Sequence, residues 1–400
     1  MYLVARGLMF ALAVLPLPGQ PASFSTAKFH GRDAYVLENA RMRVSTLRGG
    51  GHIGEVRFKS PDPKKSVNPL RIAHYPTINP YEYDPAVHDA LYGAGSNRYN
   101  QSGYMGHYTC FPNYGPPSPA EIQADLNNHG EAIRGEWKQE KVENQADAVT
   151  LRYSAALPRT QYRIGRGITL PADETVVYVE EWVENLARFD RPFAWVQHIT
   201  FGAPFVEQGR NFVDAPVARV YAERPGKTAA LAWPEASLPG GKKIDLRQFA
   251  TEAASGGYRA WLLDRKREKS FFTMYHPDYP VLIGYMFYTA DNPWIGDWQE
   301  NRKNTTKPWD GKVVARGMEV GTTPFGAPIR SLVEGGPLDS VPTYRWISAK
   351  QKLEQRYVIF LAEIPRAFRG VADVRSEPGR IVIEERETGK AIVLKSARRW

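Results

Sequence analysis

Apolar and polar residues alternate along much of this chain with a period of two. In the segment 41–47, Met42 and Val44 alternate with basic and small polar residues, and three glycines at 49–51 lead into a second alternating segment, 53–58. This spacing predicts two strands joined by a glycine turn, each with one covered face and one wetter face.

The same pattern predicts strands at many later positions. They are expected at 148–155, 161–170, 175–184, 193–201, 281–289, 356–362, 380–385 and 391–394. One short helix is expected from Pro119 to about Leu126, because Ser118 and Glu121 form a capping box. Residues 60–118 and 207–260 are rich in turn-forming residues and are predicted as long loops, which are often functional. The sequence therefore predicts an all-β protein with one short helix and long loops.

Composition agrees with this class. The 400 residues include 12% aromatic residues, 34 glycines and 31 prolines, a mixture typical of short strands joined by many turns. With 42% apolar and 24% charged residues, the chain can bury a core and is not a mainly disordered protein. No repeat or composition break divides it, so we expect one domain over 23–400, alone or with a small sandwich-like C-terminal piece.

The formal charge of +9 does not by itself indicate a nucleic-acid surface. Basic residues are mixed with acidic ones, and the basic clusters at 265–269 and 395–399 are short. A nucleic-acid surface needs a stripe of basic residues with interleaved stacking aromatics. We therefore expect no nucleic-acid partner, and the sequence does not determine an oligomeric state.

Residues 1–22 have the form of a secretory signal peptide. Arg6 precedes an apolar run at 7–17, and small residues follow up to a cleavage point near Ala22. The alternatives are a buried first strand or a membrane anchor, but the run is shorter than the roughly 20 residues that span a bilayer. We expect export to the periplasm or the extracellular space and no stable membrane span.

Metal and nucleotide motifs are incomplete. Cys110 is the single cysteine, which excludes an intrachain disulfide and any multi-cysteine metal site. His129 and Glu131 match the first half of a zinc-deaminase signature whose cysteine half is missing. Residues 49–54 match G-x-G-x-x-G, but a strand rather than a helix follows, which favours a hairpin. We expect neither a metal nor a cofactor.

Three segments do carry acid–base chemistry. His129 follows the predicted helix, His198 lies within a predicted strand beside Gln197, and Glu319 lies in a strand-like run among glycines. Taken singly, His198 is equally well explained as a core histidine and Glu319 as an edge-strand charge. Together they supply two imidazoles and one carboxylate, which suit general acid–base catalysis near neutral pH. Only a fold can bring such distant residues together.

The order of these segments resembles the galactose mutarotase-like superfamily, which comprises aldose 1-epimerases and related hexose-phosphate epimerase-like proteins. Residues 110–115 (Cys-Phe-Pro-Asn-Tyr-Gly) followed by 129–132 (His-Gly-Glu-Ala) are similar to that family's "F-P-x-F-G … H-G-x-A" segment. Glu184–Asn185 leading to His198 is similar to the strand pair of its second histidine. Met318–Glu319 is similar to the late strand that bears its base.

The resemblance covers residues 33–364 and implies a β-supersandwich whose concave face binds a sugar. It implies an aldose 1-epimerase that needs no cofactor. Glu319 would take the proton of the anomeric hydroxyl, His198 would protonate the ring oxygen, and His129 would hold the sugar.

Three further residues are candidate substrate contacts. Trp294, like Trp298 and Trp137, is a candidate stacking platform for a sugar, and Gln197 is a candidate hydrogen-bonding partner beside the second histidine. Arg98 is a candidate replacement for phosphate-gripping residues that residues 103–107 lack. The sugar is therefore left open: free, phosphorylated or part of a polymer. Two alternative functions on this fold are a non-catalytic carbohydrate-binding protein and a polysaccharide-processing enzyme with an open groove.

Overall fold

The structure is a computed structural model that describes residues 21–222, 231–238 and 240–400. Nearly all of the expected signal peptide lies outside the described residues, so export stays a prediction. Within the described part of the chain, no helix is both long enough and apolar enough to cross a membrane.

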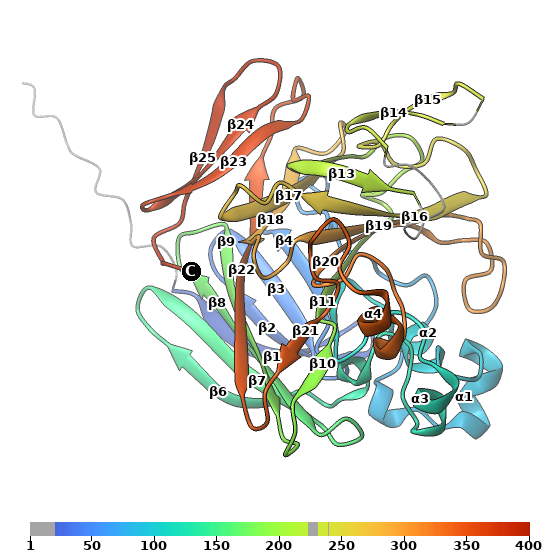
Figure 1. Cartoon of the computed structure of the whole chain (residues 1–400). Helices are drawn as coiled ribbons and strands as arrows, with labels where there is room; N and C mark the ends of the chain where they lie inside the picture. Colours follow the sequence, from blue (N-terminus) through green and yellow to red (C-terminus); the bar gives the residue numbers. More distant parts are fainter. Residues whose placement is uncertain (1–20, 223–230, 239) are drawn as a thin grey trace, which may run out of the picture.

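Two large antiparallel sheets face each other (Figure 1). The ten-stranded sheet has the order β1 (Ser23–Phe29), β2 (Arg32–Glu38), β3 (Met42–Leu47), β4 (Ile53–Phe58), β5 (His107–Cys110), β11 (Val196–Gly202), β20 (Val314–Gly321), β19 (Trp294–Asn301), β16 (Ser255–Leu263) and β13 (Val217–Tyr221). The eight-stranded sheet has the order β12 (Phe212–Asp214), β17 (Lys269–Tyr275), β18 (Val281–Tyr288), β22 (Lys352–Glu363), β9 (Val176–Asn185), β8 (Tyr162–Pro171), β7 (Ala148–Leu157) and β6 (Lys138–Asn144).

Smaller elements complete the chain. The minor sheets pair β10 (Arg191–Phe193) with β21 (Arg345–Ile347), β14 (Glu235–Ser237) with β15 (Lys243–Asp245), and β23 (Val371–Glu377) with β24 (Arg380–Glu385) and β25 (Ala391–Lys395). The helices are α1 (Pro85–Tyr92), α2 (Arg98–Gly103), α3 (Pro119–Gln123) and α4 (Ile329–Gly335), with short 3₁₀ helices η1 (Pro80–Glu82) and η2 (Glu131–Arg134). In Figure 1, α1, α2 and α3 group together at one side of the molecule.

The main apolar core lies between the inner faces of the two large sheets. Ile199 of β11 and Met318 of β20 meet Ile168 and Ile359 of the facing sheet in this cluster. Such packing of two sheets over interdigitating side chains is the usual β-sandwich solution. A second cluster joins the outer face of the eight-stranded sheet to the C-terminal sheet, through residues such as Phe360. The C-terminal piece thus packs on the sandwich rather than extending it.

Most sequence predictions of elements are confirmed. The hairpin β3–β4 forms around Gly50 and Gly51, which have φ of 72° and 63°. The capping box of α3 is present, with the Ser118 hydroxyl accepting from the amide of Glu121 and the Glu121 carboxylate accepting from the amide of Ser118.

Three expectations about elements were wrong. The segment 60–118 contains α1, α2, η1 and β5 as well as loops, so the structure has four helices among its described residues where one was expected. The segment 207–260 contains five strands at least in part, because β12 to β16 form there. The strand expected at 193–201 is divided into β10 and β11.

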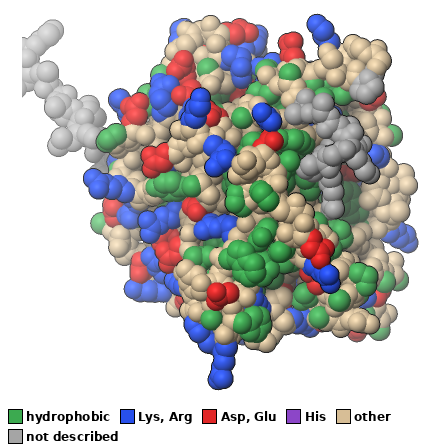
Figure 2. Space-filling view, viewed as in Figure 1, with side chains coloured by type: hydrophobic (Ala, Val, Ile, Leu, Met, Phe, Trp, Pro, Cys, Tyr) green, Lys and Arg blue, Asp and Glu red, His purple; other side chains and the backbone are tan. Residues whose placement is uncertain are grey.

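In Figure 2, basic and acidic side chains are interspersed on the face shown.

Candidate active site

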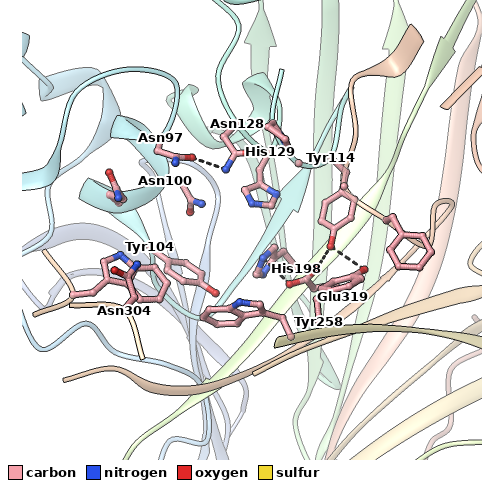
Figure 3. A pocket seen from close by; sticks show the side chains of 17 residues that line it. Asn97, Asn100, Tyr104, Tyr114, Asn128, His129, His198, Tyr258, Asn304 and Glu319 are labelled. Carbon is pink, nitrogen blue, oxygen red and sulfur yellow. Dashed lines mark hydrogen bonds and ion pairs between the residues drawn. The ribbon is translucent and has the colours of Figure 1, made fainter. Parts of the chain in front are cut away.

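The cross-strand register of β11 and β20 places His198 directly opposite Glu319. Both side chains leave the ten-stranded sheet on the face that points away from the second sheet, and the Nε2 atom of His198 lies 3.0 Å from Oε1 of Glu319 (Figure 3). Each side chain is at most 5% exposed. Two residues 121 positions apart in the chain (319 minus 198) thus form one buried pair.

A hydrogen-bond chain orients the His198 ring. Its Nδ1 atom lies 3.1 Å from the Thr200 hydroxyl, which lies 2.9 Å from the Tyr104 hydroxyl. Thr200 donates to Nδ1 when the ring proton lies on Nε2, and accepts from Nδ1 when that nitrogen carries a proton. The ring also stacks on Tyr108 of β5, with centroids 4.5 Å apart. The imidazole is therefore held with its Nε2 side toward the carboxylate.

His129 reaches the same place from a turn between α3 and η2. Its ring centroid lies 5.1 Å from that of His198, at 89°, and its Nδ1 lies 3.5 Å from the sulfur of Cys110. The turn requires Gly130, whose φ is 83° and whose added Cβ would overlap the carbonyl oxygen of Phe111. Glycine adopts this conformation without steric cost, so the His-Gly pair is a backbone requirement for placing the ring.

Glu319 has a second set of partners on its other oxygen. The Tyr114 hydroxyl donates to Oε2, and it also lies 3.1 Å from the hydroxyl of Tyr258 on β16. Gly296 and Gly317 flank Glu319 on the sheet, and side chains there would overlap Tyr258 or press on the carboxylate. The sequence's glycines near Glu319 thus leave room for its partners.

Burial sets the protonation of the site. It raises the pKa of Glu319 well above its usual value and lowers the pKa of His198 well below its usual value. Burial alone also lowers the pKa of His129 to about 4. Desolvation disfavours the charged form of each group, whereas contact at 3.0 Å favours a carboxylate–imidazolium pair. The carboxylic acid–imidazole and carboxylate–imidazolium arrangements of the pair each contain one proton and carry no net charge.

These groups line a cavity of about 410 Å³, which is the small end of the ~300–1,000 Å³ range of ligand pockets. Carboxamides and indoles make up much of its wall: Asn97, Asn100, Gln101, Asn128, Asn304, Trp298 and Trp309. In Figure 3, Asn97, Asn100 and Asn304 lie across the cavity from Glu319. The buried Nε1 of Trp309 and Oδ1 of Asn128 have no hydrogen-bond partner. None of the described lining residues is lysine or arginine.

Neither a protein-family model nor a curated protein matches the sequence. Solved structures do match the fold. A galactose mutarotase-like protein from Clostridium acetobutylicum aligns with a TM-score of 0.57 at 13% identity, over 86% of this chain and 99% of that one. A protein named as a candidate aldose 1-epimerase, from Klebsiella pneumoniae, aligns with a TM-score of 0.59 at 13% identity, over 86% and 85%. A galactose mutarotase-like protein from Lactobacillus casei gives 0.51 at 12%, over 82% and 100%.

This chain has the galactose mutarotase-like fold. The fold class expected from the sequence is therefore confirmed. At these identities the likeness shows the fold alone, so any activity has to be argued from the site.

The mutarotase-like fold brings three of the six candidate residues together and leaves three elsewhere. Glu319, His198 and His129 all line the cavity. Gln197 points to the inner face of β11, where its amide donates to Glu181 at 2.5 Å. Its predicted contact with substrate is therefore corrected, because neighbouring residues of a strand face opposite sides.

The other two candidates also lie outside the cavity lining. Trp294 is fully buried, and its Nε1 donates to the carbonyl of Pro342 at 3.3 Å. Arg98 is paired with Asp89 at 3.1 Å. The tryptophans that line the cavity are Trp298, which sequence analysis singled out, and Trp309, which it did not.

Sequence analysis missed the tyrosines and the carboxamides of the wall. Tyr114 lies within the segment 110–115 that carries the family resemblance, so a signal existed, but its contact with Glu319 depends on the fold. Asn97 and Asn100 flank Arg98 on the segment that forms α2. Nothing in their spacing distinguishes them from ordinary loop residues.

One group of possible metal ligands lies apart from the cavity, at Glu207, His276 and Asp278. The Nδ1 of His276 accepts from the amide of Asp278 at 3.0 Å, and its Nε2 lies 3.1 Å from Glu207. The first contact requires the ring proton on Nε2, so neither nitrogen offers a free lone pair. Arg210 also pairs with Asp278 at 2.6 Å. These contacts do not favour a metal site.

Proposed function

We propose that this protein is an aldose 1-epimerase-type isomerase that interconverts the anomers of an uncharged sugar. The observation that carries the proposal is the Glu319–His198 pair, 3.0 Å apart at the wall of a polar cavity. The hydroxyl and the ring oxygen of a sugar's anomeric centre are bonded to one carbon. A base and an acid that serve these two oxygens must therefore be close neighbours, as this pair is.

Ring opening moves one proton onto Glu319 and one from His198. The Glu319 carboxylate takes the proton of the anomeric hydroxyl, the O–H electron pair becomes the second bond of the aldehyde, and the bond from the anomeric carbon to the ring oxygen breaks. The ring oxygen takes the Nε2 proton of the His198 imidazolium. Rotation of the aldehyde and reclosure by the reverse proton transfers give the other anomer.

The number of protons on Glu319 and His198 before and after ring opening supports Glu319 as the base and His198 as the acid. The carboxylate–imidazolium state before ring opening and the carboxylic acid–imidazole state after it contain the same single proton within the pair. Burial favours the uncharged members of both residues, which is the state that follows ring opening. When the sugar is in its open-chain form, the pair is therefore in the protonation state that burial favours.

The remaining cavity suits a neutral polyhydroxylated ligand. Carboxamides donate to and accept from hydroxyl groups, and Asn97, Asn100, Gln101, Asn128 and Asn304 all line the cavity. His129, which is neutral near pH 7, can accept or donate one further hydrogen bond. Because none of the described lining residues is lysine or arginine, we propose an uncharged sugar rather than a sugar phosphate.

The test is polarimetry on freshly dissolved α-anomers of glucose, galactose and other aldoses, with glucose 6-phosphate for comparison. We expect the protein to accelerate mutarotation of an uncharged aldose and Glu319→Gln to lower the rate at least ~100-fold, the contribution of a positioned base. Glu334→Gln is the matched control, because Glu334 is exposed on α4 and pairs with Arg330.

Three outcomes of this experiment would contradict parts of the proposal. Full activity in Glu319→Gln would contradict the assigned base. Saturable sugar binding without acceleration would replace the isomerase by a non-catalytic carbohydrate-binding protein. Faster turnover of the phosphorylated sugar would contradict the argument from charge.

A further inference from the structure

The Tyr114 hydroxyl has one hydrogen to donate and lies between two possible acceptors. Its hydroxyl contacts Oε2 of Glu319 and lies 3.1 Å from the hydroxyl of Tyr258. Tyr258 in turn donates to the carbonyl oxygen of Pro324 at 2.6 Å. Figure 3 shows Tyr114, Glu319 and Tyr258 on the same side of the cavity. We call these groups, from Glu319 through the two hydroxyls to the Pro324 carbonyl, the hydroxyl relay.

The end of the hydroxyl relay fixes the direction of its hydrogen bonds. A carbonyl oxygen can only accept, so the single hydrogen of Tyr258 is committed to Pro324 and its oxygen is free to accept. Tyr114 can therefore donate either to Glu319 or to Tyr258. An ionised carboxylate only accepts, whereas a protonated carboxyl can itself donate to Tyr114.

We propose that Tyr114 is a positioning residue whose hydroxyl hydrogen points to Glu319 when that carboxyl is ionised and turns to Tyr258 when it is protonated. The inference deepens the proposed function and rests on it for its catalytic meaning. Glu319 changes its protonation twice in each ring opening and closure. A hydroxyl that turns with it keeps every group of the buried relay hydrogen-bonded in both states, which avoids the cost of an unpaired buried polar atom.

The backbone holds both tyrosines in place for this role. Tyr114 is anchored by a bridge to Ala327, whose amide donates to the Tyr114 carbonyl at 2.8 Å. Gly296 is the cross-strand neighbour of Glu319 on β19, and a side chain there would overlap the Tyr258 hydroxyl. The hydroxyl of Tyr258 thus occupies the space that Gly296 leaves beside the carboxylate.

Other titratable groups surround Glu319 but do not occupy its Oε2 side. His198 of β11 contacts Oε1, and the remaining neighbours are Tyr104, Tyr108, Cys110 and His129. Burial raises the pKa of the two tyrosines and of the cysteine and lowers the pKa of His129. All four are therefore uncharged near pH 7. A charge on Glu319 is met by His198 on one oxygen and by Tyr114 on the other.

The two ends of the hydroxyl relay should act in opposite directions. Tyr114→Phe removes a donor from the ionised carboxylate, so the titration midpoint of Glu319 moves to higher pH by about one pH unit. Tyr258→Phe removes the acceptor that Tyr114 needs when Glu319 is protonated, so the midpoint moves to lower pH. A merely structural role would not produce shifts of opposite sign.

The experiment is a pH titration of the full chain labelled with ¹³C at the glutamate side-chain carboxyls and followed by NMR. The Glu319 signal is the one missing from Glu319→Gln. Tyr285→Phe is the control, because Tyr285 is a buried tyrosine located in the core between the sheets, and it should leave the midpoint unchanged.

Opposite shifts for the two relay variants support the proposal, and shifts of the same sign or no shift overturn it. If Tyr114→Phe fails to fold, Tyr258→Phe decides alone: a shift to lower pH supports the relay and no shift overturns it. The readout needs no substrate, so it is independent of polarimetry. A protein without epimerase activity can still show the relay, and an active epimerase can lack it.

Discussion

At His129, burial rather than any neighbouring charge decides the protonation state. Desolvation is the single cause that lowers its pKa to about 4, and the same cause acts on His198 and, with the opposite sign, on Glu319. The chemical character of the site therefore comes from where the side chains lie. A solvent-exposed copy of the same three residues would have ordinary pKa values.

This burial predicts a pH-dependent stability. The pKa of His129 is about 4 when folded and 6.5 when unfolded, so the unfolded state binds more protons as the pH falls through this window. The stability is complete above pH 6.5 and is lost toward pH 4. Between pH 7.5 and 5.0 the contribution amounts to about 2 kcal/mol at 1.36 kcal/mol per pKa unit. Urea unfolding at both pH values measures it.

The variant His129→Gln should lose about 2 kcal/mol less than the wild type over that interval. His30→Gln, at an exposed turn, controls for the loss of a histidine as such. Equal pH dependence in His129→Gln and the wild type would contradict a half-buried His129 that stays neutral.

At the scale of elements, strand β11 shows how one segment serves two purposes. Gln197 points into the core between the sheets and His198 points into the cavity. In the turn at 129–130, Gly130 lets the turn that carries His129 approach the end of β5 closely. In both places the backbone conformation determines where the imidazole lies.

We predict that Gly130→Ala destabilises the protein more than Gly95→Ala does. The two glycines have similar φ values, 83° and 86°, but a Cβ overlaps Phe111 at Gly130 and meets nothing within 4 Å at Gly95. Gly95→Ala should cost ~1 kcal/mol of backbone strain, and Gly130→Ala about 2–4 kcal/mol because overpacking adds to strain. Denaturant unfolding measures both, and equal costs would show that the close approach is unimportant.

At the scale of the whole molecule, one buried carboxylate links both sheets behind the cavity. Glu181 of β9 pairs with Arg166 of β8 at 2.6 Å and accepts from Thr109 of β5 and from Trp195 and Gln197 near and on β11. Both members of the ion pair are fully buried. Strand β5 and strand β11, which carries His198, are thereby tied to the facing sheet.

We predict that Glu181→Gln costs ~3–5 kcal/mol, because it leaves the buried Arg166 without its counter-charge. Glu180→Gln is the matched control on the same strand. Its carboxylate is half exposed and pairs with Arg152 and Arg356, so its loss should cost less than about 1 kcal/mol. Denaturant unfolding of the two variants tests this, and similar losses would contradict the importance of the buried pair.

The sequence by itself determined the features that depend on local pattern. Alternation located β3, β4, β7, β8, β9, β18, β22, β24 and β25. Ser118 and Glu121 located the N-terminus of α3, and the glycines at 49–51 located a hairpin. Residue chemistry and segment order were enough to select His129, His198 and Glu319. These inferences hold because a strand's period, a capping box and a turn each depend on residues that are near one another in the chain.

Tertiary structure alone decided which side of β11 faces the cavity. Alternation shows that Gln197 and His198 point in opposite directions, but every residue of β11 is buried, so no polar face marks the outer side. The pairing of His198 with Glu319, the contact of Tyr114 with both Glu319 and Tyr258, and the absence of Arg98 and Trp294 from the cavity depend on strand order and register. Strand pairing brings together residues that are far apart in the chain, and the residue pattern of one strand does not determine which strand pairs with it or in which register.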